Sequence, residues 1–324
     1  MGIALLSKYL KTAVAAAAIM AAGISHAAAE WPEKPVRWMM GFAPGGGADT
    51  TARMIAAELA KKWKQPVIIE NKPGAGGTIA ADVVAKSPPD GYTINFATLN
   101  HSVTPSQREL TFDPIADFAP VIKIGKHPGV LVVNPSLQVN SVKEFIDYAK
   151  AHPGELNYGS TGSDSPYLSM EMFKKDVGID VRNVKYVSSG PVIVSLLGNE
   201  IQAAFAGVEA NAELITSGKL KALAITATAP VGRLPDVPTL ASEIGAPEFD
   251  EGTWYGVLAP AKTPDAIIDK MNKDIAEVLK MPEIHDRMAH NGFIFETGTP
   301  AEFSTFLKTD IEKWAALLKS IGSQ

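Results

Sequence analysis

Short apolar runs alternate along the chain with longer segments that carry apolar residues on one helical face. Val142, Phe145, Ile146 and Ala149 follow the i, i+3, i+4, i+7 spacing of an amphipathic helix. The apolar runs are of strand length and are bounded by glycine, proline and polar turn residues. The pattern predicts strands at Val36–Met40, Val67–Glu70, Tyr92–Ala97, Val130–Val133, Leu156–Tyr158, Val184–Val187, Ala203–Phe205 and Leu220–Thr226.

Strands separated by helical segments predict βαβ units and parallel sheet. The pattern restarts near Val130, which predicts two lobes. Two late helices, one opening at Thr263-Pro264 and one from about Ala301 to Ile321, are expected to return to the first lobe. We therefore expect lobe 1 to comprise residues 30–127 plus 228–324, and lobe 2 to comprise residues 128–227.

The first 29 residues differ from the rest of the chain. Lys8 and Lys11 precede an apolar, alanine-rich run of about a dozen residues, and small residues follow it. This is the pattern of a secretory signal peptide, and the run is well short of the ~20 residues that span a bilayer. We expect cleavage after Ala27 or Ala29.

Composition narrows the cellular setting and the partners. The chain has 324 residues, no cysteine and a formal net charge of −5. An exported chain without cysteine has no disulfides and no lipid on an N-terminal cysteine, which favours a Gram-negative periplasm. A mildly acidic surface disfavours nucleic acid and anionic membranes.

The segment Gly41–Thr50, here called the glycine loop, joins a predicted buried strand to a predicted helix. Its three consecutive glycines allow close approach to the main chain, and free N–H groups at a helix start favour an anion. Asp49 has two interpretations, a helix N-cap or a direct ligand contact. The candidate binding residues in this loop are Phe42, Ala43, Gly46, Gly47 and Asp49.

Other loops also follow strand carboxyl ends, where ligands sit in α/β sheets. Pro73–Gly77 is glycine-rich, and Thr98–Ser102 follows the third predicted strand. The segment Tyr158–Pro166 carries several hydroxyls that can bind a carboxylate without a charged side chain. Each of these loops also has a purely structural interpretation, as a tight turn or a helix cap. The candidate residues here are Gly76, Gly77, Asn100, His101, Ser160, Ser163, Ser165 and Ser189.

Sequence motifs of catalysis are absent. The six histidines form no H-E-x-x-H motif, there is no G-x-S-x-G elbow, and thiol chemistry is excluded. We expect a binding protein rather than an enzyme, with no metal and no cofactor. A catalytic triad dispersed along the sequence stays open as an alternative.

Several motifs in order resemble the Bug family, the extracytoplasmic receptors of tripartite tricarboxylate transporters. They span the chain after the signal segment: Trp31-Pro32-Glu33-Lys34-Pro35-Val36, the glycine loop, Glu70-Asn71-Lys72-Pro73-Gly74-Ala75-Gly76-Gly77, Pro89-Asp90-Gly91-Tyr92-Thr93, Phe112-Asp113-Pro114, Asp117–Val121, Leu234–Thr239 and Trp254-Tyr255-Gly256.

The resemblance implies a two-lobe type II periplasmic-binding-protein fold, or Venus flytrap, with a mixed, mostly parallel sheet in each lobe. It implies a monomer that captures a small carboxylate, whether a di- or tricarboxylate, an amino acid or an aromatic acid, and delivers it to inner-membrane permease subunits. A carboxylate sensor for a membrane kinase and, less in keeping with the motifs, an exported enzyme are the alternatives. The sequence departs from the family at Val187–Pro191 and Gly207–Asn211, where Glu209 would repel a second carboxylate or attract an amine.

Overall fold

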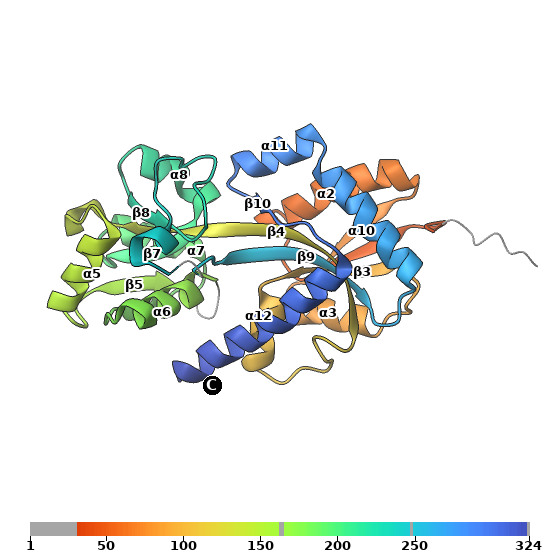
Figure 1. Ribbon diagram of the computed structural model, residues 1–324, viewed down its shortest axis with the longest axis horizontal. Coiled ribbons are helices and arrows are strands. Elements are labelled where there is room, and N and C mark those ends of the chain that lie inside the picture. Colours follow the sequence, from red (N-terminus) through yellow and green to blue (C-terminus); the bar gives the residue numbers. More distant parts are fainter. Residues whose placement is uncertain (1–30, 162–164, 247–248, 323–324) are drawn as a thin grey trace, which may run out of the picture.

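The computed structural model describes residues 31–161, 165–246 and 249–322, so the predicted signal segment lies outside it. Two sheets lie side by side along the long axis and are joined by the 16-residue strand β4, which belongs to both (Figure 1). The strands are β1 (Val36–Met40), β2 (Val67–Asn71), β3 (Thr93–Thr98), β4 (Phe118–Val133), β5 (Asn157–Ser160), β6 (Arg182–Lys185), β7 (Ala203–Gly207), β8 (Lys221–Ile225), β9 (Gly252–Pro260) and β10 (Ile294–Phe295).

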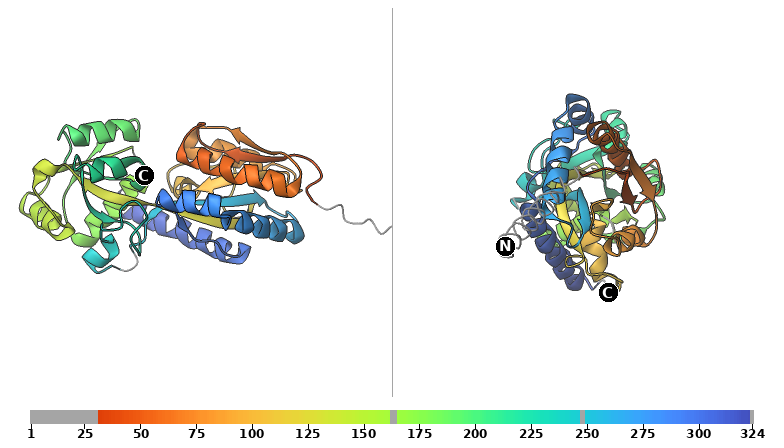
Figure 2. Two further views of the ribbon diagram at one scale, coloured as in Figure 1. Left: turned by 90° about the horizontal axis from the view of Figure 1, so that it is seen from above. Right: turned by 90° about the vertical axis from the view of Figure 1, so that its right-hand side faces the viewer.

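Helices cover both faces of each sheet, and Figure 2 shows the two lobes as separate bodies of chain. The longer helices are α2 (Gly47–Trp63), α3 (Thr78–Ala85), α5 (Val142–Ala151), α6 (Ser165–Val177), α7 (Ser189–Leu197), α8 (Val208–Thr216), α10 (Asp265–Leu279), α11 (Pro282–His290) and α12 (Pro300–Ser320). Shorter turns of helix are α4 (Asn100–Val103), α9 (Leu240–Ile244), and the 3-10 segments Ala75–Gly77, Thr104–Ser106 and Pro135–Leu137.

The first lobe has the strand order β2-β1-β3-β9-β4, with β10 on the far side of β4. Strand β1 is parallel to β2 and β3, whereas β9 is antiparallel to both β3 and β4. One face packs on α2, α10 and α11, through residues such as Ile55, Leu59 and Met271. The other packs on α3 and α12, where Trp254 and Trp314 are buried.

The second lobe has the order β6-β5-β7-β4, with β8 also paired to β4. The parallel pairs are β5–β6 and β5–β7, and the pairs that involve β4 are antiparallel. The expected α/β architecture with two lobes and mixed sheets is confirmed. Each antiparallel pair among the described strands involves β4 or β9, so the sheets are not mostly parallel as the resemblance implied.

Several buried residues after position 228 lie with the second lobe rather than the first. Leu240, Ala241 and Phe249 share a buried cluster with Phe145 of α5, and Leu234 is buried against Val130. The expected division at residue 228 therefore differs from the packing. The chain leaves this cluster only at the start of β9, where it joins the first sheet.

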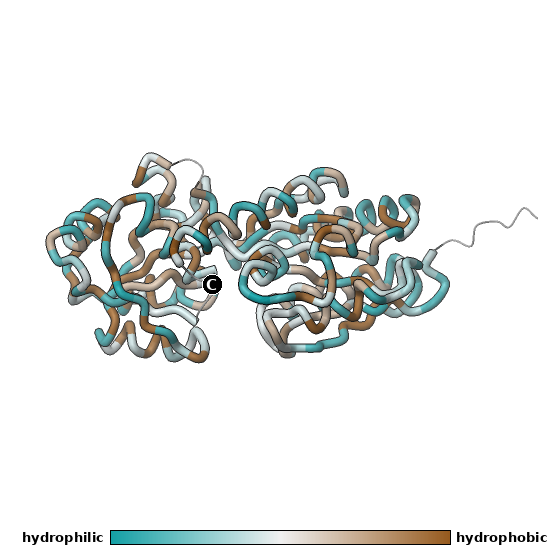
Figure 3. Tube along the Cα trace, turned by 90° about the horizontal axis from the view of Figure 1, so that it is seen from below, coloured by the Kyte–Doolittle hydropathy of each residue, from teal (hydrophilic) through white to brown (hydrophobic). Residues whose placement is uncertain are grey.

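Hydrophobic and hydrophilic segments alternate along the outer helices (Figure 3). Among the described residues, no helix combines the length and the apolar character needed to cross a bilayer. This agrees with amphipathic helices that bury one face on a sheet.

Candidate functional site

The glycine loop leads from buried strand β1 into α2 at the edge of the first lobe. Residues Ala43 to Gly47 are exposed, and α2 begins at Gly47 with Gly46 as its N-cap and no side-chain cap bond. The first N–H groups of a helix lack an intrahelical acceptor, so the amides at this end remain available to an anion.

Asp49 is not the N-cap that one interpretation of the sequence predicted. It lies at the third helical position, because the helix begins at Gly47, three residues earlier than an Asp49 cap would place its start. Its buried carboxylate accepts hydrogen bonds from the Gly45 N–H (2.9 Å), from Asn71 Nδ2 (2.8 Å) and from both Nε and Nη2 of Arg53 (2.9 and 3.0 Å). The Arg53 hydrogen bonds lower the pKa of Asp49 to about 2. Asp49 therefore holds the loop's shape as an anion.

Asn71 extends this brace to the strand after α2. Its Nδ2 also donates to the carbonyl of Phe42 at 2.9 Å, and its Oδ1 accepts from Arg53 Nη2 at 2.8 Å. Sequence reasoning missed Arg53 and Asn71 as supports of the glycine loop. The i, i+4 spacing of Asp49 and Arg53 was the available signal for one of them.

A cavity of about 470 Å³, here called the interlobe cavity, opens between the start of α2 and the start of α8. Because α2 belongs to the first lobe and α8 to the second, both lobes form its walls. Its lining combines Gly45, Gly47, Thr50, Thr51, Met54, His127, Tyr255, Arg287, Met288 and Asn291 with Gly207, Val208, Glu209 and Ala210.

Tyr255 and His127 form the aromatic floor of the interlobe cavity. Their rings lie 5.4 Å apart, and a Cβ built on Gly47 would be 3.8 Å from the Tyr255 hydroxyl. Burial lowers the pKa of His127 to about 4, so the ring is neutral near pH 7. Trp254, the neighbour of Tyr255, points to the opposite face of β9 and packs on Phe303, because strand side chains alternate.

A second cavity of about 440 Å³, here called the serine cavity, lies within the second lobe. It shares Gly207 and Ala210 with the interlobe cavity, so the two cavities adjoin. Its polar residues are Ser160, Thr161, Ser189 and Asn211, and its apolar wall comes from Val192, Ile193, Phe205 and Leu214.

The predicted serines of the second lobe divide into several positions. Ser160 ends β5, is buried, and its hydroxyl accepts from Asn183 Nδ2 at 2.8 Å. Ser189 is exposed at the first position of α7, and both of these serines line the serine cavity. Ser165 begins α6, and Ser163 lies outside the described residues.

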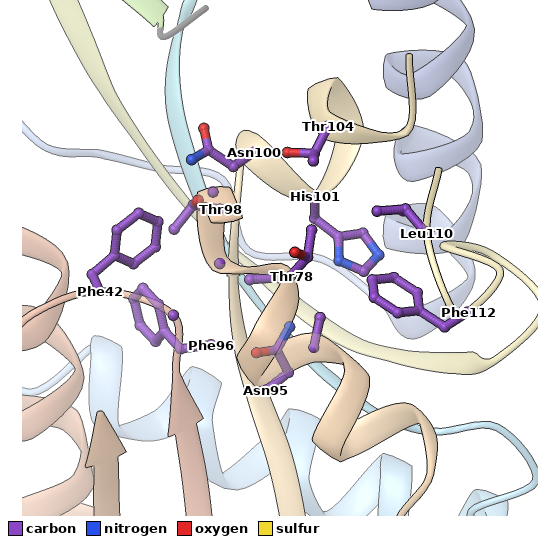
Figure 4. Close-up of a pocket in the computed structure, with 15 residues that line it drawn as sticks. Phe42, Thr78, Asn95, Phe96, Thr98, Asn100, His101, Thr104, Leu110 and Phe112 are labelled. Carbon is purple, nitrogen blue, oxygen red and sulfur yellow. The ribbon is translucent and has the colours of Figure 1, made fainter. Parts of the chain in front are cut away.

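A third cavity gathers Phe42, Gly76, Gly77, Asn100 and His101, all predicted from sequence (Figure 4). Its volume of about 20 Å³ leaves room for about one water. Gly76 and Gly77 have φ of 70° and 94°, a left-handed backbone that favours glycine, and they lie against Gly41 and Asn100.

His101 has structural partners. Its Nε2 is 2.9 Å from the carbonyl oxygen of Pro114, and its ring packs against Phe112 and Phe118. Burial lowers its pKa to about 4.

The structure thus brings the predicted residues together around three cavities. Ala43, Gly46, Asp49 and Ser165 line none of the three, although Gly46 and Asp49 shape the loop beside the interlobe cavity.

In the part of the chain that the structure describes, no group of three or more histidine, aspartate or glutamate side chains is arranged to hold a metal ion. What the geometry offers instead is exposed backbone amides, hydroxyls and a few charged side chains around adjoining hollows. That arrangement suits capture of a small polar solute.

Comparison with known proteins agrees with this geometry. The sequence pattern described as "Tripartite tricarboxylate transporter family receptor" matches residues 51–323. The protein BugT of Bordetella pertussis is 35% identical over 316 residues, covering 94% of this chain and 95% of that protein.

Two solved structures extend the comparison. Rpa4515 of R. palustris with adipate is 32% identical with a TM-score of 0.77, covering 90% of this chain and 99% of that one. MatC of Rhodopseudomonas palustris with bound malate is 30% identical with a TM-score of 0.73, covering 89% and 100%. Proteins of this kind are periplasmic solute-binding receptors, not enzymes. The chain belongs to the tripartite tricarboxylate transporter receptor family.

Proposed function

We propose that this protein captures a small carboxylate between its two lobes and delivers it, as a monomer, to permease subunits in the inner membrane. The observation that carries the proposal is the interlobe cavity, which both lobes line and which the exposed amides at the start of α2 border. A ligand that touches both lobes binds the closed arrangement better and shifts the population toward it.

The chemistry of the walls supports a carboxylate. First-turn N–H groups and hydroxyls can hold carboxylate oxygens directly or through water. Two similar proteins, Rpa4515 and MatC, hold adipate and malate, which are small carboxylic acids. The likeness of these proteins extends over nearly all of this chain. We extend that ligand class to this protein as part of the proposal.

We further propose that the lobes hinge where β4 and the start of β9 pass between them. The crossing lies near Lys126–Gly129 on β4 and near Glu251–Gly252 on the return strand. We also propose that residues 1–29 are removed on export, which N-terminal sequencing of the protein recovered from periplasm would test.

Calorimetry and thermal unfolding with mono-, di- and tricarboxylates and amino acids test the central proposal. At least one acid should bind with a defined stoichiometry and raise the unfolding temperature. Mass spectrometry of protein purified without added ligand should identify a retained acid. Folded protein that binds none of these compounds would overturn the proposal.

A further inference from the structure

Two charged side chains from opposite lobes face the interlobe cavity. Glu209 lies in the first turn of α8 and Arg287 in the last turn of α11. Both residues are exposed. Among the described residues, neither the Glu209 carboxylate nor the Arg287 guanidinium makes a hydrogen bond or ion pair, and Arg233 Nη1 donates to the backbone carbonyl of Glu209 at 3.4 Å, not to its carboxylate. Each charge is therefore free to meet a ligand.

Glu209 and Tyr255 line the interlobe cavity together, one from each lobe. Burial and the negative charge of Glu209 together raise the pKa of Tyr255. The Tyr255 hydroxyl lies beside Gly47 at the start of α2, so the carboxylate acts on the hollow into which the glycine loop opens. The start of α8 contacts the first lobe, since a Cβ built on Gly292, two residues beyond α11, would lie 3.2 Å from Val208.

The walls of the interlobe cavity thus carry charges of both signs. The first lobe offers amide N–H groups and Arg287, which favour an anion. The second lobe offers Glu209, which disfavours a second anion and favours a cation. The adjoining serine cavity has an apolar wall that can hold carbon chain between two polar ends.

We infer that the ligand carries one carboxylate and one cationic nitrogen, and that Glu209 is a specificity-determining residue that rejects dicarboxylates. The inference rests on the proposed function and narrows it. It sets this protein apart from its similar neighbours, whose bound acids, adipate and malate, carry two carboxylates.

The test uses three ligands of equal chain length, namely hexanoate, adipate and 6-aminohexanoate, with the four-carbon set butyrate, succinate and 4-aminobutyrate beside them. Calorimetry on the whole protein should give an aminocarboxylate affinity at least about tenfold above that of the matching dicarboxylate. Glu209→Gln should lower that ratio by about tenfold or more, because it weakens the aminocarboxylate and strengthens the dicarboxylate.

Glu213→Gln is the matched control, since it removes the same charge one turn further along α8, away from the lining of the interlobe cavity. It should leave the ratio unchanged. Arg287→Gln should weaken all carboxylates by a similar factor, including hexanoate. Circular dichroism confirms that each variant is folded, and because these side chains are exposed the fold should persist.

The possible results distinguish a failure of the inference about Glu209 from a failure of the proposed function. If dicarboxylates bind as well as aminocarboxylates and Glu209→Gln changes nothing, the inference fails and the proposed function stands. If Glu209→Gln weakens hexanoate as much as 6-aminohexanoate, Glu209 serves lobe closure through Arg287 and not selection, and the inference also fails. If no acid binds to folded protein, both fail together.

Discussion

The backbones of Gly41 and Gly77 touch: a Cβ built on Gly41 would lie only 2.4 Å from the Cα of Gly77. Gly41 opens the glycine loop, and Gly77 closes the turn before α3. The contact fixes two loops of the first lobe against each other without any side chain. It explains why position 41 is occupied by glycine.

Gly41→Ala should destabilise the protein by roughly 3 kcal/mol, because the added methyl meets backbone that cannot move aside. Urea unfolding followed by circular dichroism measures the change. Gly190→Ala is the control, since a Cβ there meets nothing within 4 Å. A Gly41→Ala protein as stable as the unmodified one would mean that the loops can separate without cost.

Gly47→Ala should weaken ligand binding without lowering the stability of the fold. Gly47 is helical, so alanine there should raise the free energy of unfolding by up to about 1 kcal/mol. The new methyl projects beside Tyr255 into the interlobe cavity and should weaken ligand binding by roughly tenfold. Calorimetry with the best-binding acid checks this, and unchanged affinity would place the ligand elsewhere.

Asp49→Asn should loosen the glycine loop. The substitution removes the anion that Arg53, Asn71 and Gly45 hold, and we expect a loss of about 1–2 kcal/mol at pH 7, since Arg53 is half exposed to solvent. The pKa of Asp49 is lowered, so its contribution is complete above about pH 4 and is lost as the pH falls through about 2. Asp147→Asn, in an exposed pair with Lys143, is the control and should leave stability nearly unchanged.

His101 should make the protein acid-sensitive. Its pKa is about 4 when folded and near 6.5 when unfolded, so the unfolded state takes up the proton first as the pH falls. Stability should therefore drop between pH 6.5 and 4, by up to about 3 kcal/mol. His101→Gln should reduce this slope by about half, because buried His127 has the same lowered pKa and keeps its own contribution, whereas His285→Gln, on a half-exposed side chain, should not change it. Equal slopes in all three proteins would contradict the burial of a neutral imidazole.

Glu251 should have the opposite effect on the pH dependence of stability from that of His101. It lies just before β9, is buried and is paired with Lys313, and burial raises its pKa to about 7. Asp310 adds to that rise, while Lys126 and Lys313 oppose it. The unfolded state releases its proton near pH 4.5, so folding becomes less favourable as the pH rises from 4.5 to 7.

Glu251→Gln, which resembles the protonated form, should match the unmodified protein at pH 4.5 and exceed its stability at pH 7.5 by up to about 3 kcal/mol. Chemical unfolding at the two pH values measures the difference. A variant that is less stable at pH 7.5 would show that the ion pair with Lys313 outweighs burial.

The hydrophobic pattern predicted most elements of the fold, including β1 at its observed bounds and the long final helix within one residue. It missed β9 and residues 118–129 of β4. Pro120, Pro128 and two glycines interrupt that part of β4, and such residues ordinarily argue against a strand. The ladder tolerates them through register shifts near Pro120 and Gly125, which no local pattern reveals.

The sequence by itself determined the alternation of strands and helices, the turns at strand ends, and a glycine loop whose main chain is open to close approach. These features depend on local spacing and on the positions of glycine and proline. Only the tertiary structure decided that Leu240 and Phe249 pack with the second lobe, that Asp49 braces a loop rather than caps a helix, and that Glu209 and Arg287 share one cavity. Those relationships join residues far apart in the chain. They depend on which surfaces meet once β4 and β9 have crossed between the lobes.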